Sequence, residues 1–137
     1  MNVAIVVSDF NYKITSKMLQ IALEKIKRLK IDVIHVCKVY GVFDMPIIVD
    51  ALLKKNNIDA VITLGAIIKG QTKHDEVIAH TVLTSLSYLS LKYKKPVSLG
   101  ISEPGMHERI AYSRIRQMPE NAVDAAIKSL FELENIK

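Results

Sequence analysis

A short polar segment carries the residue types that chemistry would need. Gly70, Gln71 and Thr72 follow an apolar stretch that begins at residue 58, and His74 comes two residues later. Thr72 and Asp75 have the spacing of a capping box, so Thr72 is predicted to be the N-cap of a helix with His74 in its first turn. The N–H groups and the positive dipole end of such a helix bind anions. The segment therefore predicts an anion site beside an imidazole.

His74 itself has two interpretations. An imidazole at this position can act as a general acid or base near neutral pH, but it can also be an ordinary surface histidine. His74 and His80 are six residues apart, so they do not share a helix face as the histidines of an HExxH pair would, and His35 and His107 belong to distant segments. A metal site is therefore not expected. The sequence also lacks GxSxG, GxGxxG and GxxxxGK[ST] motifs.

Further candidates follow neighbouring apolar runs. Phe10 is either a hydrophobic staple onto the next helix or an aromatic platform for a planar heterocycle. Asp44, after Gly41-Val42-Phe43, either caps a helix or accepts hydrogen bonds from ligand hydroxyls, and the two roles can coexist. Three arginines form either a solvated helix face or a set of cations that reach the anion site from a neighbouring loop or subunit: Arg109, Arg114 and Arg116.

Strands and helices that would position these residues alternate along the chain. Apolar runs bounded by turn residues predict strands over 3–7, 33–39, 60–64 and 96–101. Helical spacing of apolar residues predicts helices over 14–29 with Asn11 as N-cap, 44–57, 72–93, 107–116 and, after an interruption at Met118 and Pro119, 123–131. This order predicts an α/β fold with a parallel sheet covered on both faces. Ligands bind beyond the carboxyl ends of such strands, so the loops to inspect are 8–11, 40–44, 66–74 and 100–105.

Composition narrows the class of protein. The 137 residues, half of them apolar, fit one domain with an ordinary core. The start of the chain lacks the basic region of a signal peptide, and no apolar run approaches the ~20 residues of a membrane span, so no membrane partner is expected. The single Cys37 favours a reducing cytoplasm. The net charge of +5 is spread over several helix ends, and no basic tract is interleaved with aromatic residues, so nucleic-acid binding is not expected. A phosphorylated small substrate accounts for the positive charge equally well.

Five segments resemble one known family over nearly the whole chain. They are SDFNYKIT, GVFDMP, DAVITLGAIIKGQTKHDEV, KPVSLGIS and NAVDAA, in the family's order and spacing. The family is 6,7-dimethyl-8-ribityllumazine synthase in its compact archaeal form. The resemblance implies a flavodoxin-like three-layer α/β/α sandwich with a four-stranded parallel sheet, one domain over 1–137, and a homopentamer with active sites between subunits. It also implies condensation of 5-amino-6-(D-ribitylamino)uracil with 3,4-dihydroxy-2-butanone 4-phosphate, which releases phosphate and water and requires no cofactor.

The resemblance also implies residue roles. His74 would be the proton-transfer residue, and the phosphate would be bound by Gln71, Thr72 and Arg114, with Arg114 contributed by the adjacent subunit. The pyrimidine and ribityl groups would contact Phe10, Val42, Phe43, Asp44, Ala66, Ile67, Ile68 and, from the adjacent subunit, Leu99. Phe10 would stack on the ring, Asp44 would face the ribityl hydroxyls, and residues 66–68 would present their backbone to the pyrimidine.

Two departures from the family pattern and two other functions remain open. Asn121 stands where many relatives have a basic residue, and Arg116 is a candidate substitute. The chain begins almost at its first strand, without the extension by which longer relatives add a strand to a neighbour, so both a pentamer and a 60-subunit shell are compatible with it. The alternatives are archaeal-type riboflavin synthase, whose substrate carries no phosphate, and a non-catalytic flavin-binding or shell-forming protein.

Overall fold

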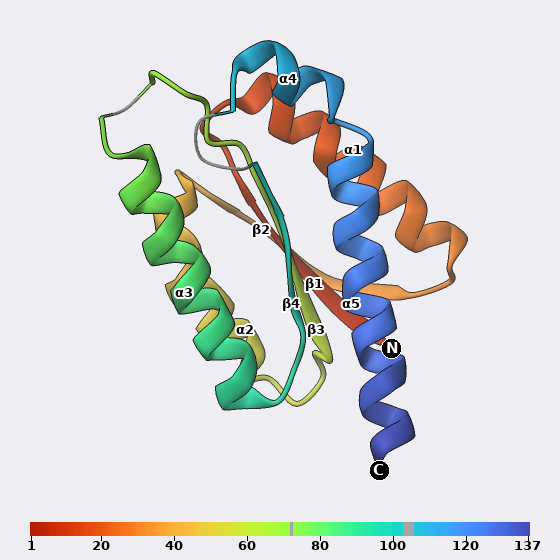
Figure 1. Ribbon diagram of the computed structural model, residues 1–137. Helices are drawn as coiled ribbons and strands as arrows, with labels where there is room; N and C mark the ends of the chain where they lie inside the picture. Colours follow the sequence, from red (N-terminus) through yellow and green to blue (C-terminus); the bar gives the residue numbers. More distant parts are fainter. Residues whose placement is uncertain (72, 103–105) are drawn as a thin grey trace.

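Four parallel strands form one sheet in the part of the chain that the computed structural model describes, residues 1–71, 73–102 and 106–137 (Figure 1). The strands are β1 (Asn2–Ser8), β2 (Asp32–Val39), β3 (Ala60–Gly65) and β4 (Val97–Ile101), in the spatial order β2-β1-β3-β4. Each lies within one residue of its predicted bounds. The strand order changes direction between β1 and β3, so the switch point at which such sheets bind ligands lies there.

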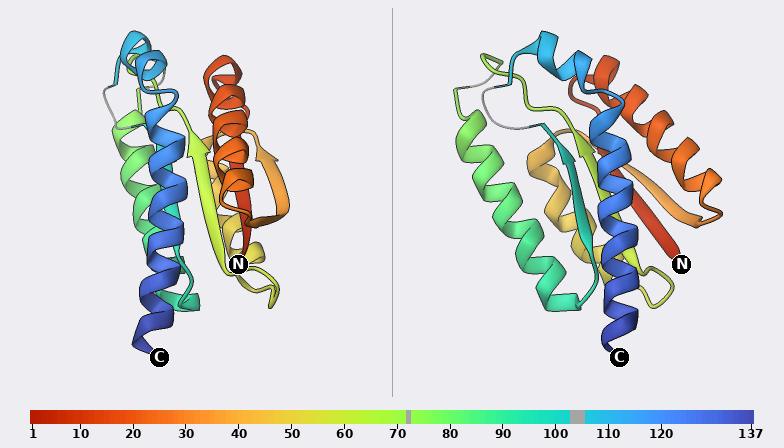
Figure 2. Two further views of the ribbon diagram at one scale, coloured as in Figure 1. Left: turned by 90° about the vertical axis from the view of Figure 1, so that its right-hand side faces the viewer. Right: turned by 45° about the vertical axis from the view of Figure 1, so that its right-hand side comes forward.

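Helices cover both faces of this sheet. Helices α1 (Tyr12–Arg28) and α5 (Gln117–Ile136) pack on one face, and α2 (Met45–Leu53) and α3 (Asp75–Tyr93) pack on the other (Figure 2). Because both faces are covered, the central strand β3 is buried along its whole length and consists mainly of apolar residues. The predicted flavodoxin-like three-layer α/β/α sandwich with a four-stranded parallel sheet is confirmed.

The start of α3 differs from the prediction. The helix begins at Asp75, so His74 occupies the N-cap position rather than the first turn, and Thr72, the predicted N-cap, lies outside the described residues. The turn before the helix explains the shift. Gly70 has a φ of 89°, and the Gln71 N–H donates to the carbonyl of Ile68 at 3.3 Å, so the chain is still turning at residue 71.

The last two helices also differ in their bounds. Helix α4 (Glu108–Ser113) is shorter than predicted, and α5 begins at Gln117, so Met118 and Pro119 do not interrupt it. A proline is tolerated there because the first turn of a helix has no intrahelical partner for its N–H. Ala126 is buried as predicted, whereas Phe131 is 57% exposed. The C-terminal end of α5 extends beyond the sheet (Figure 1).

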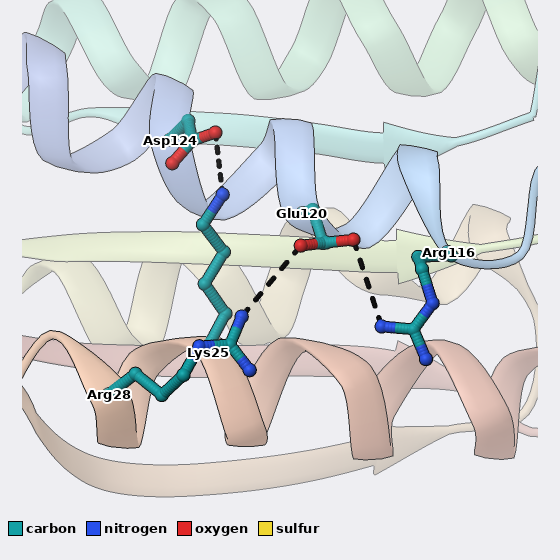
Figure 3. Close-up of polar contacts among 5 residues, drawn as sticks. All are labelled: Lys25, Arg28, Arg116, Glu120 and Asp124. Carbon is teal, nitrogen blue, oxygen red and sulfur yellow. Dashed lines mark hydrogen bonds and ion pairs between the residues drawn. The ribbon is translucent and has the colours of Figure 1, made fainter.

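Ion pairs join the two helices of the α1/α5 layer. Lys25 of α1 contacts Asp124 of α5 at 2.7 Å, and Arg28 of α1 lies 3.8 Å from Glu120 of α5 (Figure 3). Glu120 also lies 3.9 Å from Arg116, the N-cap residue of its own helix. Exposed pairs of this kind contribute about 0–1 kcal/mol each, so the apolar contacts beneath them dominate the stability of this layer. None of the described helices has the length and apolar character needed to cross a bilayer.

Candidate active site

The loops after β1 and β2 are joined by backbone hydrogen bonds at the carboxyl edge of the sheet. The Asp9 N–H donates to the carbonyl of Val39 at 2.7 Å, and the Phe10 N–H donates to the carbonyl of Tyr40 at 2.9 Å. The Phe10 ring then stacks on the Tyr40 ring, with 6.4 Å between centroids and 24° between planes. Phe10 is 47% exposed, so it is not simply a staple buried against α1.

Tyr40 was not among the predicted site residues. Its signal in the sequence is its place directly after the second strand, close to the position of Phe10, which is the second residue after the first strand. Because parallel strands end at one edge, two aromatic residues at these positions come together. The pair gives this edge an open aromatic surface, since Tyr40 is 79% exposed.

The segment after Tyr40 forms a short 3₁₀ helix, η1 (Val42–Asp44). Val42 is buried and Phe43 is 62% exposed, so the two apolar residues of this predicted site face different surroundings. Asp44 stands at the N-cap position of α2, but its Oδ2 accepts the Gly41 N–H at 3.0 Å instead of capping that helix. The predicted capping of α2 by this side chain is therefore wrong, and the carboxylate closes the η1 turn.

Residues 66–68 continue from β3 and lie beside the Phe10 loop. Ala66, Ile67 and Ile68 are buried as whole residues, at 3%, 7% and 4% exposure. The contact of their backbone with a pyrimidine stays a prediction. Asn11 lies at the N-cap position of α1 with a φ of 64°, but its side-chain Nδ2 donates to the Ala66 carbonyl at 2.8 Å. The predicted capping of α1 by the Asn11 side chain is wrong; its backbone carbonyl begins the helix instead.

The turn after residue 68 carries the predicted anion-binding and proton-transfer residues. Gln71 and His74 are both exposed, and His74 immediately precedes α3, whose first turn contains Asp75 and Glu76. The Lys69 N–H donates to the Met106 carbonyl at 2.8 Å, which fastens this turn to the segment after β4. The β3–α3 turn therefore lies at the same carboxyl edge of the sheet as the loops that follow β1 and β2 (Figure 1). Thr72, the other predicted phosphate ligand, lies outside the described residues.

Arg114 and Leu99 lie together at a different part of the molecule. They line a cavity of about 220 Å³ beside the open edge of β4 and the start of α5, together with Ile101, Met106, Gln117, Met118 and Asn121. The cavity therefore joins the two residues that the resemblance assigns to the neighbouring subunit's site. Its lining does not include Phe10, η1 or His74.

Arg116 does not line this cavity with Arg114. Its guanidinium points toward Glu120 on the side of α5 that faces α1 (Figure 3). Asn121, in contrast, contributes to the cavity lining. Of the two candidates for the second polar partner of Arg114, the geometry therefore favours Asn121, a neutral amide in place of a cation.

Comparisons with known proteins identify the family of the chain. The family model for 6,7-dimethyl-8-ribityllumazine synthase matches residues 1–136. The chain is similar to two proteins of this name. The protein from Sulfolobus acidocaldarius is 47% identical over 99% of this chain and 86% of its own length. The protein from Methanobrevibacter smithii is 46% identical over 98% of this chain and 97% of its own length. A third, from Pyrobaculum arsenaticum, is 46% identical over 92% of this chain and 84% of its own length. The chain therefore belongs to the 6,7-dimethyl-8-ribityllumazine synthase family, whose members are transferases of riboflavin biosynthesis.

Proposed function

We propose that this protein condenses 5-amino-6-(D-ribitylamino)uracil with 3,4-dihydroxy-2-butanone 4-phosphate to form 6,7-dimethyl-8-ribityllumazine. The observation that carries this proposal is the match of family and fold over the whole chain. Residues of three of the five motifs follow β1, β2 and β3 at one edge of the sheet, and Leu99 and Asn121, from the other two, line the cavity beside β4. Both substrates are small molecules, and the two halves of the reaction call for different surroundings.

The pyrimidine half is served by the β1 and β2 loops. The exposed face of Phe10 offers a flat apolar surface on which a heterocycle stacks, and Tyr40 fixes the ring from its other side. Val42 and Phe43 supply the apolar contacts beside it. Asp44 donates no proton when ionised and uses Oδ2 for Gly41, so its remaining lone pairs accept hydrogen bonds from the ribityl hydroxyls. Ala66, Ile67 and Ile68 contribute backbone to the same wall.

The phosphate half is served by the β3–α3 turn and by a cation. Gln71 and Thr72 provide amide and hydroxyl donors, and Arg114 provides a guanidinium, which matches phosphate geometry with paired N–H groups. Because Arg114 lines a cavity beside β4 and not beside Phe10, it reaches the phosphate from a second copy of the chain. Leu99 comes with it and closes over the open side of the pyrimidine.

The chemistry requires positioning and proton transfer. The 5-amino group of the pyrimidine attacks the ketone and forms a Schiff base with loss of water. Elimination of phosphate leaves an enol that tautomerises to a ketone, and the ribitylamino nitrogen attacks this carbonyl and closes the ring with loss of a second water. His74, at the start of α3 beside Gln71, moves protons during these steps. The leaving phosphate needs a fixed site, since its departure places two negative charges beside the turn.

Because the proposed site needs residues from two copies of the chain, we propose that the protein is a homo-oligomer with a pentamer as its basic unit. We also propose that it acts in the cytoplasm. The edge strand β4 and the exposed end of α5 support it, because they flank an apolar groove of about 600 Å³ whose lining includes Leu91, Val97, Leu133 and Ile136. An uncovered edge strand beside apolar side chains is the kind of surface that a second subunit covers.

The test is a reaction with both purified substrates, followed by lumazine absorbance and inorganic phosphate. We expect both products to appear together, in equal amounts and well above the spontaneous rate. Neither product above that rate would refute the proposal. Riboflavin formed from lumazine alone would assign the chain to the riboflavin synthase activity instead.

A further inference from the structure

One peptide group on the proposed pyrimidine wall is held at both ends by side chains from neighbouring loops. The peptide joins Ala66 to Ile67. Its carbonyl accepts a hydrogen bond from Asn11 Nδ2 at 2.8 Å, and its N–H donates to Ser102 Oγ at 2.5 Å. Asn11 and Ser102 follow β1 and β4, the two strands that flank β3 in the sheet. The two hydrogen bonds therefore reach the peptide from both sides of β3.

Ser102 makes more than one contact with this segment. The same hydroxyl donates to the Ile67 carbonyl at 2.8 Å, and the Ser102 N–H donates to the Gly65 carbonyl at 3.2 Å. A hydroxyl has one donor and two acceptor sites, so one Oγ can serve both the N–H and the carbonyl of Ile67. Ser102 is 3% exposed, and a buried hydroxyl with both functions engaged has a fixed orientation.

The backbone of Asn11, as well as its side chain, favours the hydrogen bond to the Ala66 carbonyl. Its φ of 64° and ψ of 44° lie in the left-handed region, which asparagine and glycine tolerate better than other residues. Its carbonyl accepts the N–H groups of Ile14 and Thr15 at 2.9 and 3.0 Å, so the residue is fixed to the start of α1. Asn11 also directly follows Phe10. The contact with Ala66 consequently fixes the distance between the aromatic platform and the backbone wall, across the switch point of the sheet.

We propose that Asn11 and Ser102 are positioning residues for the pyrimidine substrate. By fixing the plane of the 66–67 peptide relative to Phe10, they orient the backbone that the heterocycle contacts. This inference rests on the proposed pyrimidine site. Asn11 and Ser102 would not touch the substrate. They would act through their hydrogen bonds to Ala66 and Ile67.

Substitutions at Asn11 separate this role from general stability. Asn11→Asp keeps the shape and tolerates the left-handed backbone, but it places a carboxylate oxygen against the Ala66 carbonyl. Asn11→Gly keeps the backbone freedom and removes only the side chain. We expect Asn11→Asp to raise the KM for ribitylaminouracil by about tenfold and Asn11→Gly by somewhat less, with a change below about twofold in the KM for the phosphorylated ketone. Asn57→Asp, an exposed change at the opposite end of the sheet, is the matched control.

Substitutions at Ser102 test the other end of the peptide without changing the Phe10 loop. Ser102→Ala removes the partner of the Ile67 N–H and carbonyl, and we expect the same selective rise in the KM for the pyrimidine. Ser102→Thr keeps the hydroxyl, so it should restore the KM toward the wild-type value. If Ser102→Ala fails to fold, the two Asn11 variants decide the question.

Phe10→Ala distinguishes failure of this inference from failure of the proposed site. If Phe10→Ala raises the KM for the pyrimidine while the Asn11 and Ser102 variants keep the wild-type ratio of the two KM values and lose only thermal stability, the positioning role is refuted. If Phe10→Ala also leaves that KM unchanged, the pyrimidine wall itself is wrongly placed, and the positioning role is refuted with it.

Discussion

The proposed role of Arg114 can be tested separately from the other roles, because only one of the two substrates carries the phosphate that it would bind. It lies at the end of α4, exposed, and lines the cavity beside β4. Hydrogen bonds to charged groups contribute about 1.5–3 kcal/mol, which corresponds to roughly 10- to 100-fold in binding. We expect Arg114→Ala to raise the KM for the phosphorylated ketone by this factor in steady-state kinetics, with little effect on the KM for the pyrimidine.

Arg28→Ala is the matched control for that experiment. Arg28 is an exposed arginine at the far end of α1, and its 3.8 Å contact with Glu120 is a surface pair of small energetic value. Both KM values should stay at the wild-type level in this variant. Equal effects of Arg114→Ala on the two substrates would remove Arg114 from the phosphate site.

His74 is expected to affect turnover rather than binding. It occupies the N-cap of α3, three residues after Gln71 of the proposed phosphate site. Because positioning supplies much of the rate in this condensation, we expect His74→Gln to lower kcat by about tenfold, less than the ~10²–10⁴ typical of general acid–base catalysis. The KM for the pyrimidine should change little. His80→Gln, an exposed change on the same helix, should behave as wild type. A wild-type kcat in His74→Gln would exclude proton transfer by His74.

Residue positions relative to the ends of strands were predictable, but contacts between distant loops were not. Phe10 and Asp44 could be placed at the carboxyl edge because each follows a strand. The contact of Asn11 with Ala66 joins residues 55 positions apart, and nothing in the local sequence of either residue signals it. Asparagine is a common N-cap residue, so a hydrogen bond from the Asn11 side chain to the start of α1 was expected. Its left-handed backbone turns the side chain toward β3 instead.

At the scale of elements, Gly65 sets how closely η1 approaches the end of β3. A Cβ atom on Gly65 would lie 2.7 Å from Cγ2 of Val42 and 3.2 Å from Cε of Met45, both buried side chains. We therefore expect Gly65→Ala to lower the free energy of unfolding by about 1–3 kcal/mol, the usual range for overpacking a core. Denaturant unfolding measures this directly.

Gly41→Ala provides the comparison for Gly65→Ala. A Cβ there would meet its nearest neighbour, Oδ2 of Asp44, at 3.6 Å, which is an ordinary contact, and the φ of −136° suits any residue. The loss of stability should be below about 0.5 kcal/mol, as for most surface substitutions. Similar losses of stability in the two variants would show that the close contact of Val42 with Gly65 does not cause the destabilisation of Gly65→Ala.

The contact between α2 and α3 is expected to depend on pH. The Tyr93 hydroxyl donates to Asp50 Oδ1 at 2.8 Å, and Lys54 Nζ lies 3.0 Å from Oδ2. The Tyr93 hydrogen bond, followed by that from Lys54, lowers the pKa of Asp50 below its ordinary value. A carboxyl group with a lowered pKa in the folded state stabilises the fold above its unfolded pKa, about 4, and this contribution is lost as the pH falls through the folded-state pKa.

Asp50→Asn should therefore be less sensitive to acid than the wild type. Comparison of unfolding free energies at about pH 6 and pH 2 should show a smaller loss in the variant, and Tyr93→Phe should reduce the loss in the same direction by removing the main cause of the pKa shift. The same drop in all three proteins would exclude Asp50 as a source of the acid sensitivity.

Element order was predictable from apolar periodicity, whereas element ends depended on particular turns. Continuous apolar runs give the bounds of the four strands to within one residue. Helix α3 begins later than the Thr72–Asp75 spacing indicates, because the chain is still turning at Gly70 and Gln71. Pro119 suggested a break, but it lies in the first turn of α5, where the helix needs no N–H from it.

At the scale of the whole molecule, one chain holds two separate parts of the proposed site. The first consists of Phe10, η1, the 66–68 backbone and the β3–α3 turn. The second is the cavity of Arg114 and Leu99 beside the edge of β4. Both parts are open on a single chain, since Phe10 and Leu99 are 47% and 46% exposed. A sequence of one chain cannot show this division by periodicity or spacing; the placement of Arg114 in a neighbour's site came from the resemblance alone.

Subunit mixing tests this division most directly. Phe10→Ala and Arg114→Ala proteins are each expected to have low activity, and the two variants are co-expressed or refolded together in equal amounts. Wherever the intact Phe10 of one variant faces the intact Arg114 of the other, a complete site forms, so about a quarter of the sites should be restored. The account predicts activity well above that of either variant, with the KM values of the wild-type protein. Activity no higher than the mean of the two separate variants would contradict a site shared between subunits.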